Sequence, residues 1–238
     1  MTHFINILIL IIVISSCQID KKNSLDLCEQ ELNLIKGNST LTVEYDFNLD
    51  KQKQFENFQS QIDINICNGV FPLNGRFCTS TSDTINVLIF AERFCENDTT
   101  NNSEILCFLT RSLKIQIDSI SKIRVEDEIV PKDSLTDFIA HRAEEFFIKN
   151  EFEYAIFDLE SDKNTLTNLK KYVFERVVDG YLLAAEKYSI RLFNKKICKL
   201  NNDEIIEITR NFRLVIGVSD DVPKPPPPPP PPKYLIDE

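Results

Sequence analysis

Residues 84–218 alternate between segments of strand periodicity and segments of helix periodicity, and this order limits the possible folds more than any other feature. Apolar runs or strict apolar alternation at 85–91 and 113–117 are typical of strands. A 3.6-residue apolar period at 134–149 and again at 166–192 predicts two helices. Because strands and helices follow one another along the chain, we expect an α+β fold. Its small mixed sheet would carry two or three helices on one face.

Shorter segments complete this region. An acidic pair at 126–127 separates two short apolar segments, which predicts a tight hairpin or an interrupted strand. Ser134 and Asp137 form a capping-box-like start for the first helix. Gly180 lies inside the long helix at a cost of about 1 kcal/mol relative to alanine, so we expect it to mark a close contact. The remaining expected elements are a strand at 152–159, a short helix at 202–211 and a strand at 212–218.

The first 17 residues predict export. Residues 4–14 form an apolar run broken only by Asn6, which is about half the ~20 residues of a membrane-spanning helix. The run closes with Ile14-Ser15-Ser16-Cys17, which resembles a bacterial lipobox, so we expect cleavage before Cys17 and acylation of the new N-terminus. The segment lacks the Lys or Arg that normally opens a signal peptide. A plain secretory signal and a short uncleaved anchor therefore remain alternatives.

The rest of the chain divides by composition into three regions. These are a cysteine-containing N-terminal region at 18–83, the α+β domain at 84–222 and a proline-rich tail at 223–238. In the first region, apolar alternation predicts a strand at 41–47, and two phenylalanines three residues apart predict a short helix at 51–60. Residues 68–83 are rich in Gly, Asn, Ser and Thr, and we expect them to be a loop.

Six further cysteines indicate disulfide bonds, because an even number is typical of a protein from an oxidising compartment. They are Cys28, Cys67, Cys78, Cys95, Cys107 and Cys198. The sequence does not choose among the pairings. We favour Cys67 with Cys78 and Cys95 with Cys107, because each pair would close a short loop that contains turn residues. Buried free thiols are the alternative.

The tail contains an unbroken run of prolines: Pro225, Pro226, Pro227, Pro228, Pro229, Pro230, Pro231 and Pro232. Consecutive prolines form a stiff polyproline II rod, here about 25 Å long at ~3.1 Å per residue. Such a rod can bind an aromatic-lined groove on a partner or serve as a solvated spacer. Tyr234 and the apolar pair after it favour a docking role. We therefore treat the prolines and Tyr234 as a candidate partner-binding tail.

Composition and motifs argue against several functions. A net charge of −10, without a basic stripe, argues against nucleic-acid binding. The two histidines, His3 and His141, and the absence of a CxxC motif favour neither a metal site nor a cofactor. We expect His141 on or beside the apolar stripe of its helix, partly buried. Asp158 and Glu160 lie on one side of a strand and could form a carboxylate pair, but no partner is identifiable. We predict that the chain is not an enzyme.

The order of elements in 84–223 resembles the periplasmic region of ExbD/TolR-type biopolymer-transport proteins, in the branch with a long C-terminal extension. The strand–turn–strand at 123–130 leads to the helix at Ser134, then to the strand at 154–159 and a charged turn at 160–165. The long helix with Val178-Asp179-Gly180-Tyr181, the acidic third helix and the final strand follow in the same order.

The resemblance implies a protein-binding domain near an energy-transducing complex of the envelope. Family members carry a membrane-spanning helix with an Asp that takes part in proton-driven energy transfer, alongside a channel partner. Residues 4–14 contain no acidic side chain, so no residue here is assigned that role. We expect a lipid-anchored envelope protein that faces the periplasm or the cell surface and binds or scaffolds proteins. A peptidoglycan-binding or surface lipoprotein and a membrane-anchored transporter accessory are the alternatives.

Overall fold

A computed structural model describes residues 27–37, 39–63, 69–93, 111–118 and 120–219. Its strands are β1 (Thr42–Tyr45), β2 (Gly69–Cys78), β3 (Thr84–Arg93), β4 (Leu113–Ile117), β5 (Ile123–Val125), β6 (Glu128–Ile129), β7 (Tyr154–Ser161) and β8 (Arg213–Ser219). Its α-helices are α2 (Glu29–Ile35), α3 (Lys51–Ile62), α4 (Leu135–Ala143), α5 (Thr167–Phe193) and α6 (Asn202–Asn211). Short turns of other helix types are η3 (Lys132–Ser134), η4 (Glu144–Ile148) and η5 (Ile197–Lys199).

The eight strands form one mixed sheet in the order β1-β2-β3-β8-β7-β4-β5-β6. Its four central strands, β3, β8, β7 and β4, are parallel, so their carboxyl ends share one edge of the sheet. The predicted α+β class is confirmed. The sheet is larger than the small one expected, because the N-terminal region supplies β1 and β2 and thereby extends it beyond β3.

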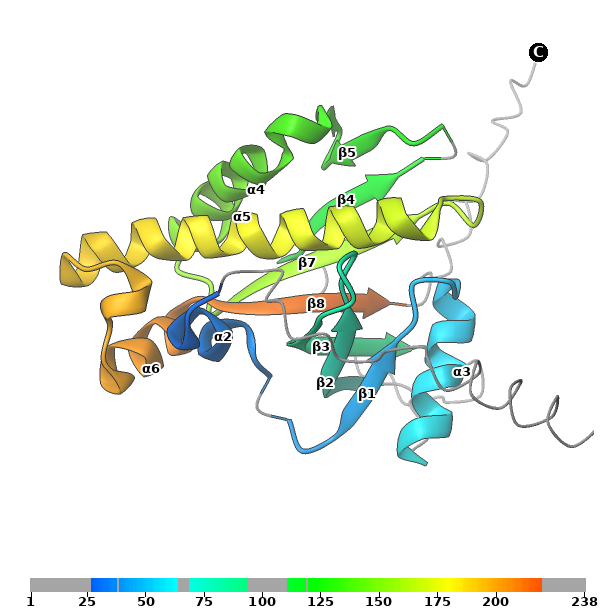
Figure 1. The fold of residues 1–238 in the computed structure, drawn as a ribbon, viewed down its shortest axis with the longest axis horizontal. Helices are drawn as coiled ribbons and strands as arrows, with labels where there is room; N and C mark the ends of the chain where they lie inside the picture. The colour runs from blue at the N-terminus through cyan, green and yellow to red at the C-terminus, as the bar shows by residue number, and fades with distance from the viewer. Residues whose placement is uncertain (1–26, 38, 64–68, 94–110, 119, 220–238) are drawn as a thin grey trace, which may run out of the picture.

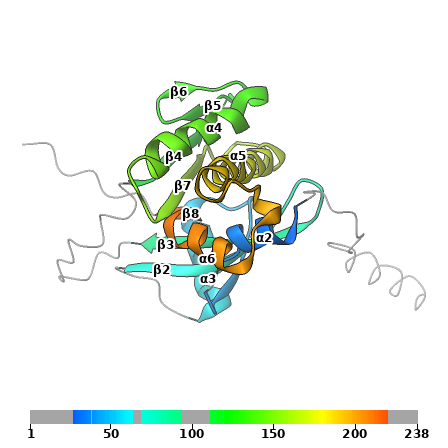
Figure 2. The same ribbon diagram turned by 90° about the vertical axis from the view of Figure 1, so that its left-hand side faces the viewer.

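The main hydrophobic core lies between the sheet and the helices on one of its faces. Figure 1 shows the long helix α5 running across β7, with α4 beside it and α2 and α6 near one end of the strands. Figure 2 shows α4, α5 and α2 on the same side of the sheet. Side chains from these helices and from alternate strand positions, such as Val87, Phe157 and Leu214, belong to one buried cluster. Because α5 has 27 residues, it extends about 40 Å and crosses most of this face.

Gly180 marks a close contact between α4 and α5, as predicted. A Cβ atom built there would lie 2.6 Å from Ile139 Cγ2 and 3.0 Å from the Thr136 carbonyl oxygen. Only a residue without a side chain fits between the two helices at this point. The lower helix propensity of glycine is therefore offset by close packing of α4 on α5.

The loop predicted at 68–83 is wrong, because most of it is strand β2. This strand pairs with β3 along its whole length and with β1 over its second half, which supplies the hydrogen bonds that its local sequence does not favour. Gly75 is required there, since an added Cβ would lie 2.2 Å from Ile89 Cδ1 and 2.8 Å from Phe77 Cε2. A residue that resembles a turn signal in the sequence thus serves close packing within the sheet.

The capping box predicted at Ser134 is also wrong. Ser134 ends the turn η3 with φ −103° and ψ 0°, and its side chain donates to the Pro131 carbonyl oxygen at 3.1 Å instead of capping α4. An N-cap residue normally has an extended backbone, which places its side-chain oxygen over the first free N–H groups. The preceding helical turn removes that geometry.

An aromatic cluster packs β1 and β2 against α5. It consists of Tyr45, Phe47, Phe77 and Phe174. Phe77 lies at its centre, with its ring centroid 4.7 Å from that of Tyr45 and 4.3 Å from that of Phe174, both in stacked arrangements. Phe77 and Phe174 are fully buried. This aromatic cluster joins the N-terminal region to the rest of the fold.

A disulfide bond joins Cys28, just before α2, to Cys198 in η5 across a sequence separation of 170 residues. Neither cysteine belongs to the pairs favoured from the sequence. Cys78 ends β2, but its expected partner Cys67 lies outside the described residues, as do Cys95 and Cys107. The disulfide is the covalent link between the first described helix and the connection from α5 to α6.

Candidate functional site

A hollow of about 370 Å³ lies at the carboxyl edge of the parallel strands, where β7 and β8 end and where α3 and α5 begin. We call it the carboxyl-edge pocket. Its lining includes Lys51, Lys53 and Gln54 of α3, Lys170 of α5, and Gly217 at the end of β8. In open α/β sheets, ligands bind outside the carboxyl ends of the strands, and ligand pockets typically measure about 300–1,000 Å³. Both its location and its size make this pocket the candidate site.

Lys51 joins two carboxylates at one side of the carboxyl-edge pocket. Its Nζ lies 3.1 Å from Glu160 Oε1 and 3.9 Å from Asp158 Oδ1. Gln116 Nε2 donates to Glu160 Oε2 at 2.7 Å. The two acids therefore lie on one side of β7, as expected, and the partner that the sequence left unidentified is a lysine 109 residues away. Because both acids lie beside this cation, the arrangement resembles a structural ion-pair network rather than an acid–base pair.

The pKa of Glu160 lies below its ordinary value. Burial raises the pKa, but the hydrogen bond from Gln116 and the charge of Lys51 outweigh burial and favour the ionised form. Burial, with Asp158 and Asp46 nearby, raises the pKa of Tyr45 to about 12. Tyr45 therefore stays protonated at neutral pH and forms a wall of the pocket rather than a base.

We expect Lys51→Met to lower the free energy of unfolding by about 2 to 4 kcal/mol at pH 7, since it leaves Asp158, which is 4% exposed, and Glu160 without their cation. A carboxyl group with a lowered folded-state pKa stabilises the fold above its unfolded pKa, and that contribution is lost as the pH falls through the folded pKa. The difference between wild type and variant should therefore shrink below about pH 4. Urea unfolding between pH 3 and pH 7 measures it.

Lys53→Met is the matched control for this prediction. The Lys53 side chain is 66% exposed and pairs with the N-cap residue Asp50 at 3.6 Å, an arrangement worth about 0.2–1 kcal/mol at a surface. Equal losses in the two variants, or a loss in Lys51→Met that does not change with pH, would contradict the assignment of Lys51 as the cation that neutralises the two acids.

Two other charged side chains near this edge are shielded from solvent, Lys170 in part and Glu92 almost completely. The pKa of Lys170 is lowered by burial, although Asp50, Asp46 and Asp162 oppose that effect. Glu92, near the end of β3, is 3% exposed, and burial raises its pKa to about 7. Its Oε1 has no hydrogen-bond partner among the described residues. Neither position stands out in the sequence, because a single Lys or Glu near the end of an element usually faces solvent.

A second hollow, of about 840 Å³, lies at the opposite edge of the sheet between α2, α6 and the first residues of β7 and β8. Its lining includes Lys36, Arg210, Arg213 and Glu153, together with Ile206, which is 54% exposed. It lies outside the amino ends of β7 and β8. The carboxyl-edge pocket is the stronger candidate, because it combines the usual position of an α/β ligand site with buried polar groups.

His141 lies on the exposed side of α4, and its side chain is 63% exposed, which corrects the partly buried position expected for it. Its Nε2 lies 3.4 Å from Glu145 Oε2 on the next turn. Cys28, Glu31 and Cys198 bring three ligand atoms within 4.8 Å. The two sulfur atoms are bonded to each other, however, and Glu31 accepts a hydrogen bond from the Cys28 backbone N–H.

The leader with Cys17 and the proline tail with Tyr234 lie outside the described residues. In the ranges that the structure describes, no helix combines the length and the apolarity needed to cross a bilayer. No protein-family model, curated protein or solved structure matches this chain.

Proposed function

We propose that this chain is an exported cell-envelope protein, lipidated at Cys17, whose α+β domain binds protein partners of an ExbD/TolR-type biopolymer transport complex. The observation that carries the proposal is the Cys28–Cys198 disulfide. Structural disulfides persist in oxidising compartments and are rare in the cytosol. The bond agrees with the exported location that the leader and the even number of further cysteines predict.

The arrangement of elements supports the family part of the proposal. The strands that carry the resemblance belong to one sheet, and the helices between them contribute side chains to one shared core. Strands β4, β7 and β8 are adjacent, and the connections between them run through α4 and α5. These elements are therefore neighbours in space and not only along the chain.

Binding fits the described side chains better than catalysis does. The carboxylates of the candidate site lie beside Lys51, and Tyr45 is kept protonated by burial. Catalytic groups usually need a pKa near the working pH and a partner aligned for proton transfer. A sheet covered by helices, with a disulfide between α2 and η5, is suited to holding a surface in place for a partner.

The test has two stages, both on the full chain in a bacterial envelope. In the first, palmitate labelling of wild type is compared with Cys17→Ala, and thiol alkylation before and after reduction reports on Cys28 and Cys198. We expect label only in the wild type, and protection of both thiols until reduction. An intact leader without label, or thiols that are alkylated without reductant, would overturn the proposal that the chain is an exported lipoprotein.

In the second stage, chemical cross-linking in the intact envelope is followed by mass spectrometry. We expect cross-links from the α+β domain to subunits of an ExbD/TolR-type complex, and the same cross-links from a variant without residues 223–238. Strong retention on purified peptidoglycan that survives high salt, without such cross-links, would replace the proposal by a glycan-binding lipoprotein.

A further inference from the structure

The carboxyl-edge pocket contains more positive than negative side chains, although the chain as a whole has a net charge of −10. Four lysines line it: Lys51, Lys53, Lys163 and Lys170. Among the described residues that line the pocket, Asp50 is the acidic one, and Asp158 and Glu160, which Lys51 contacts, are not among the lining residues. Asp50 is already engaged, because its side chain accepts from the Lys53 backbone N–H and pairs with Lys53 Nζ.

Gln54 supplies a donor without an acceptor. This residue lines the pocket and is only 2% exposed. Its Oε1 accepts from the Asp46 backbone N–H at 3.3 Å, which assigns the other end of the amide as the donor Nε2. Nε2 has no hydrogen-bond partner in the part of the chain described. A buried donor left in this state costs about 1–3 kcal/mol, so it indicates a missing acceptor.

Two helices begin at this pocket. The first turn of α3 contributes Lys51, Lys53 and Gln54, and α5 begins at Thr167, whose Oγ1 donates to Asn48 Oδ1 at 2.7 Å. The N-cap residue of α5, Leu166, makes no side-chain cap. At α3 the Asp50 side chain already accepts from the Lys53 N–H, so the uncapped start of α5, where the positive end of the helix dipole lies, is the position that favours an anion.

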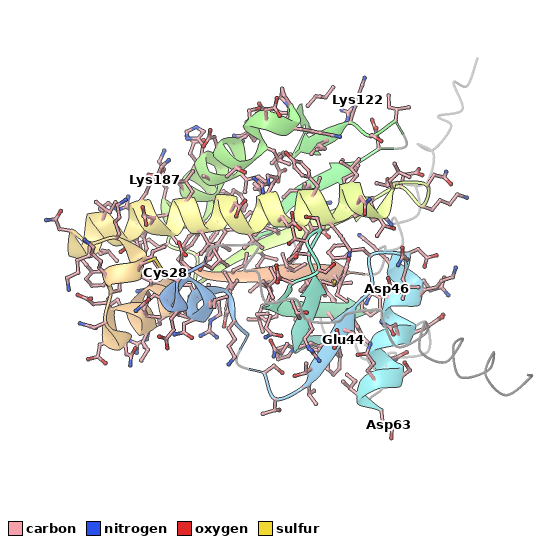
Figure 3. All side chains as sticks on the ribbon, in the orientation of Figure 1. Cys28, Glu44, Asp46, Asp63, Lys122 and Lys187 are labelled. Carbon is pink, nitrogen blue, oxygen red and sulfur yellow. A yellow bond between two sulfur atoms is a disulfide. The ribbon has the colours of Figure 1, made fainter. Side chains whose placement is uncertain are left out.

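The aspartates near Lys170 also accept hydrogen bonds from backbone N–H groups. Asp46 accepts from the Asn48 backbone N–H, and Asp162 accepts from the Asn164 backbone N–H, each at 2.9 Å. Asp46 is labelled beside the first turn of α3 in Figure 3. Their charges do not restore the ordinary pKa of Lys170, because burial has the larger effect. An anion in the pocket would therefore add a further negative partner to this partly desolvated ammonium, beside Asp46, Asp50 and Asp162.

We propose that the carboxyl-edge pocket binds a small organic anion through a carboxylate or phosphate group. The group would accept from Gln54 Nε2 and from Lys170. Apolar walls formed by Tyr45, Leu159 and Val218 would contact the organic part. The volume of about 370 Å³ suits a metabolite-sized molecule rather than a macromolecule. This inference is independent of the proposed function, since it rests on the pocket and not on the leader or on any partner protein.

The experiment titrates the full disulfide-bonded chain with inorganic phosphate and, separately, with citrate, at constant ionic strength, and follows backbone amide signals by NMR. We expect saturable shifts confined to the first turns of α3 and α5 and to residues 161–164. A tighter response to phosphate or to citrate identifies which acidic group the pocket prefers. Shifts that grow linearly without saturation, or that sodium chloride reproduces, would overturn the proposal.

Two variants locate the site, and one serves as control. Lys170→Met and Gln54→Leu keep the side-chain volume and remove a donor, and each should weaken binding about tenfold or more. Lys187→Met removes a positive charge from α5 at a position away from α3, as Figure 3 shows, and should bind like wild type. Equal affinity in all three variants would show that the anion does not bind at Gln54 and Lys170.

Discussion

Removing the Cys28–Cys198 disulfide is expected to lower the free energy of unfolding by about 4 to 5 kcal/mol, the upper range for a native disulfide. The bond closes a loop across 170 residues, and the loss of unfolded-state entropy grows with loop length. A small domain with a net stability of about 5–15 kcal/mol would lose much of its margin. The double variant Cys28→Ser/Cys198→Ser, in which neither thiol can mispair, is the form to measure by denaturant unfolding.

Reduced wild type is the natural comparison for this variant. If Cys28–Cys198 accounts for the effect, reductant should lower the stability of the wild type but leave the double variant almost unchanged. A further large loss when the double variant is reduced would assign part of the stability to other cysteines. Unchanged stability of the oxidised double variant would show that the bond does not constrain the fold.

The second large effect is expected at the centre of the aromatic cluster. Phe77→Ala should lower the free energy of unfolding by about 3 to 5 kcal/mol, because Phe77 is fully buried and stacks on two rings. The cavity would open between β2 and α5, where neither element can collapse without disturbing the sheet. Thermal and denaturant unfolding of the oxidised protein provide the measurement.

Two controls separate stacking from simple loss of volume. Phe77→Leu restores part of the volume without an aromatic ring and should lose less stability than Phe77→Ala. Ile129→Ala removes an apolar side chain that is 55% exposed on the edge strand β6 and should stay within about 0.5 kcal/mol of wild type. Similar stabilities for Phe77→Ala and Ile129→Ala would mean that β2 does not pack under α5.

Elements with strong periodicity could be predicted from the sequence. The long helix was expected at 166–192 and is Thr167–Phe193, and Gly180 does mark a close helix contact. These predictions succeed because the apolar face of a helix is visible within one turn or two of sequence. The same local signals gave the α+β class.

Strand β2 could not be predicted, because its stability comes from residues distant in the chain. Asn74 and Gly75, in the middle of this strand, are residues typical of a turn. Their strand conformation depends on pairing with β1 and β3 and on the packing of Phe77 under α5. Tertiary pairing outweighs local preference most strongly in strands, where propensity depends on the neighbours.

The candidate site shows the same limit. Periodicity placed Asp158 and Glu160 on one side of a strand, but it could not identify Lys51, which comes from a helix in the N-terminal region. Gln54 could not be recognised either, since an unpaired amide is a property of packing and not of residue type. In both cases the missing information is which distant element covers the carboxyl edge of the sheet.

The disulfide also has a topological consequence for a protein exposed to proteases. It turns the polypeptide between Cys28 and Cys198 into a covalent ring. A single peptide-bond cleavage within that ring opens it but releases no fragment, so the two pieces would run apart only on a reducing gel. Two cuts would be needed to excise any of the strands from β1 to β7, which all lie inside the ring.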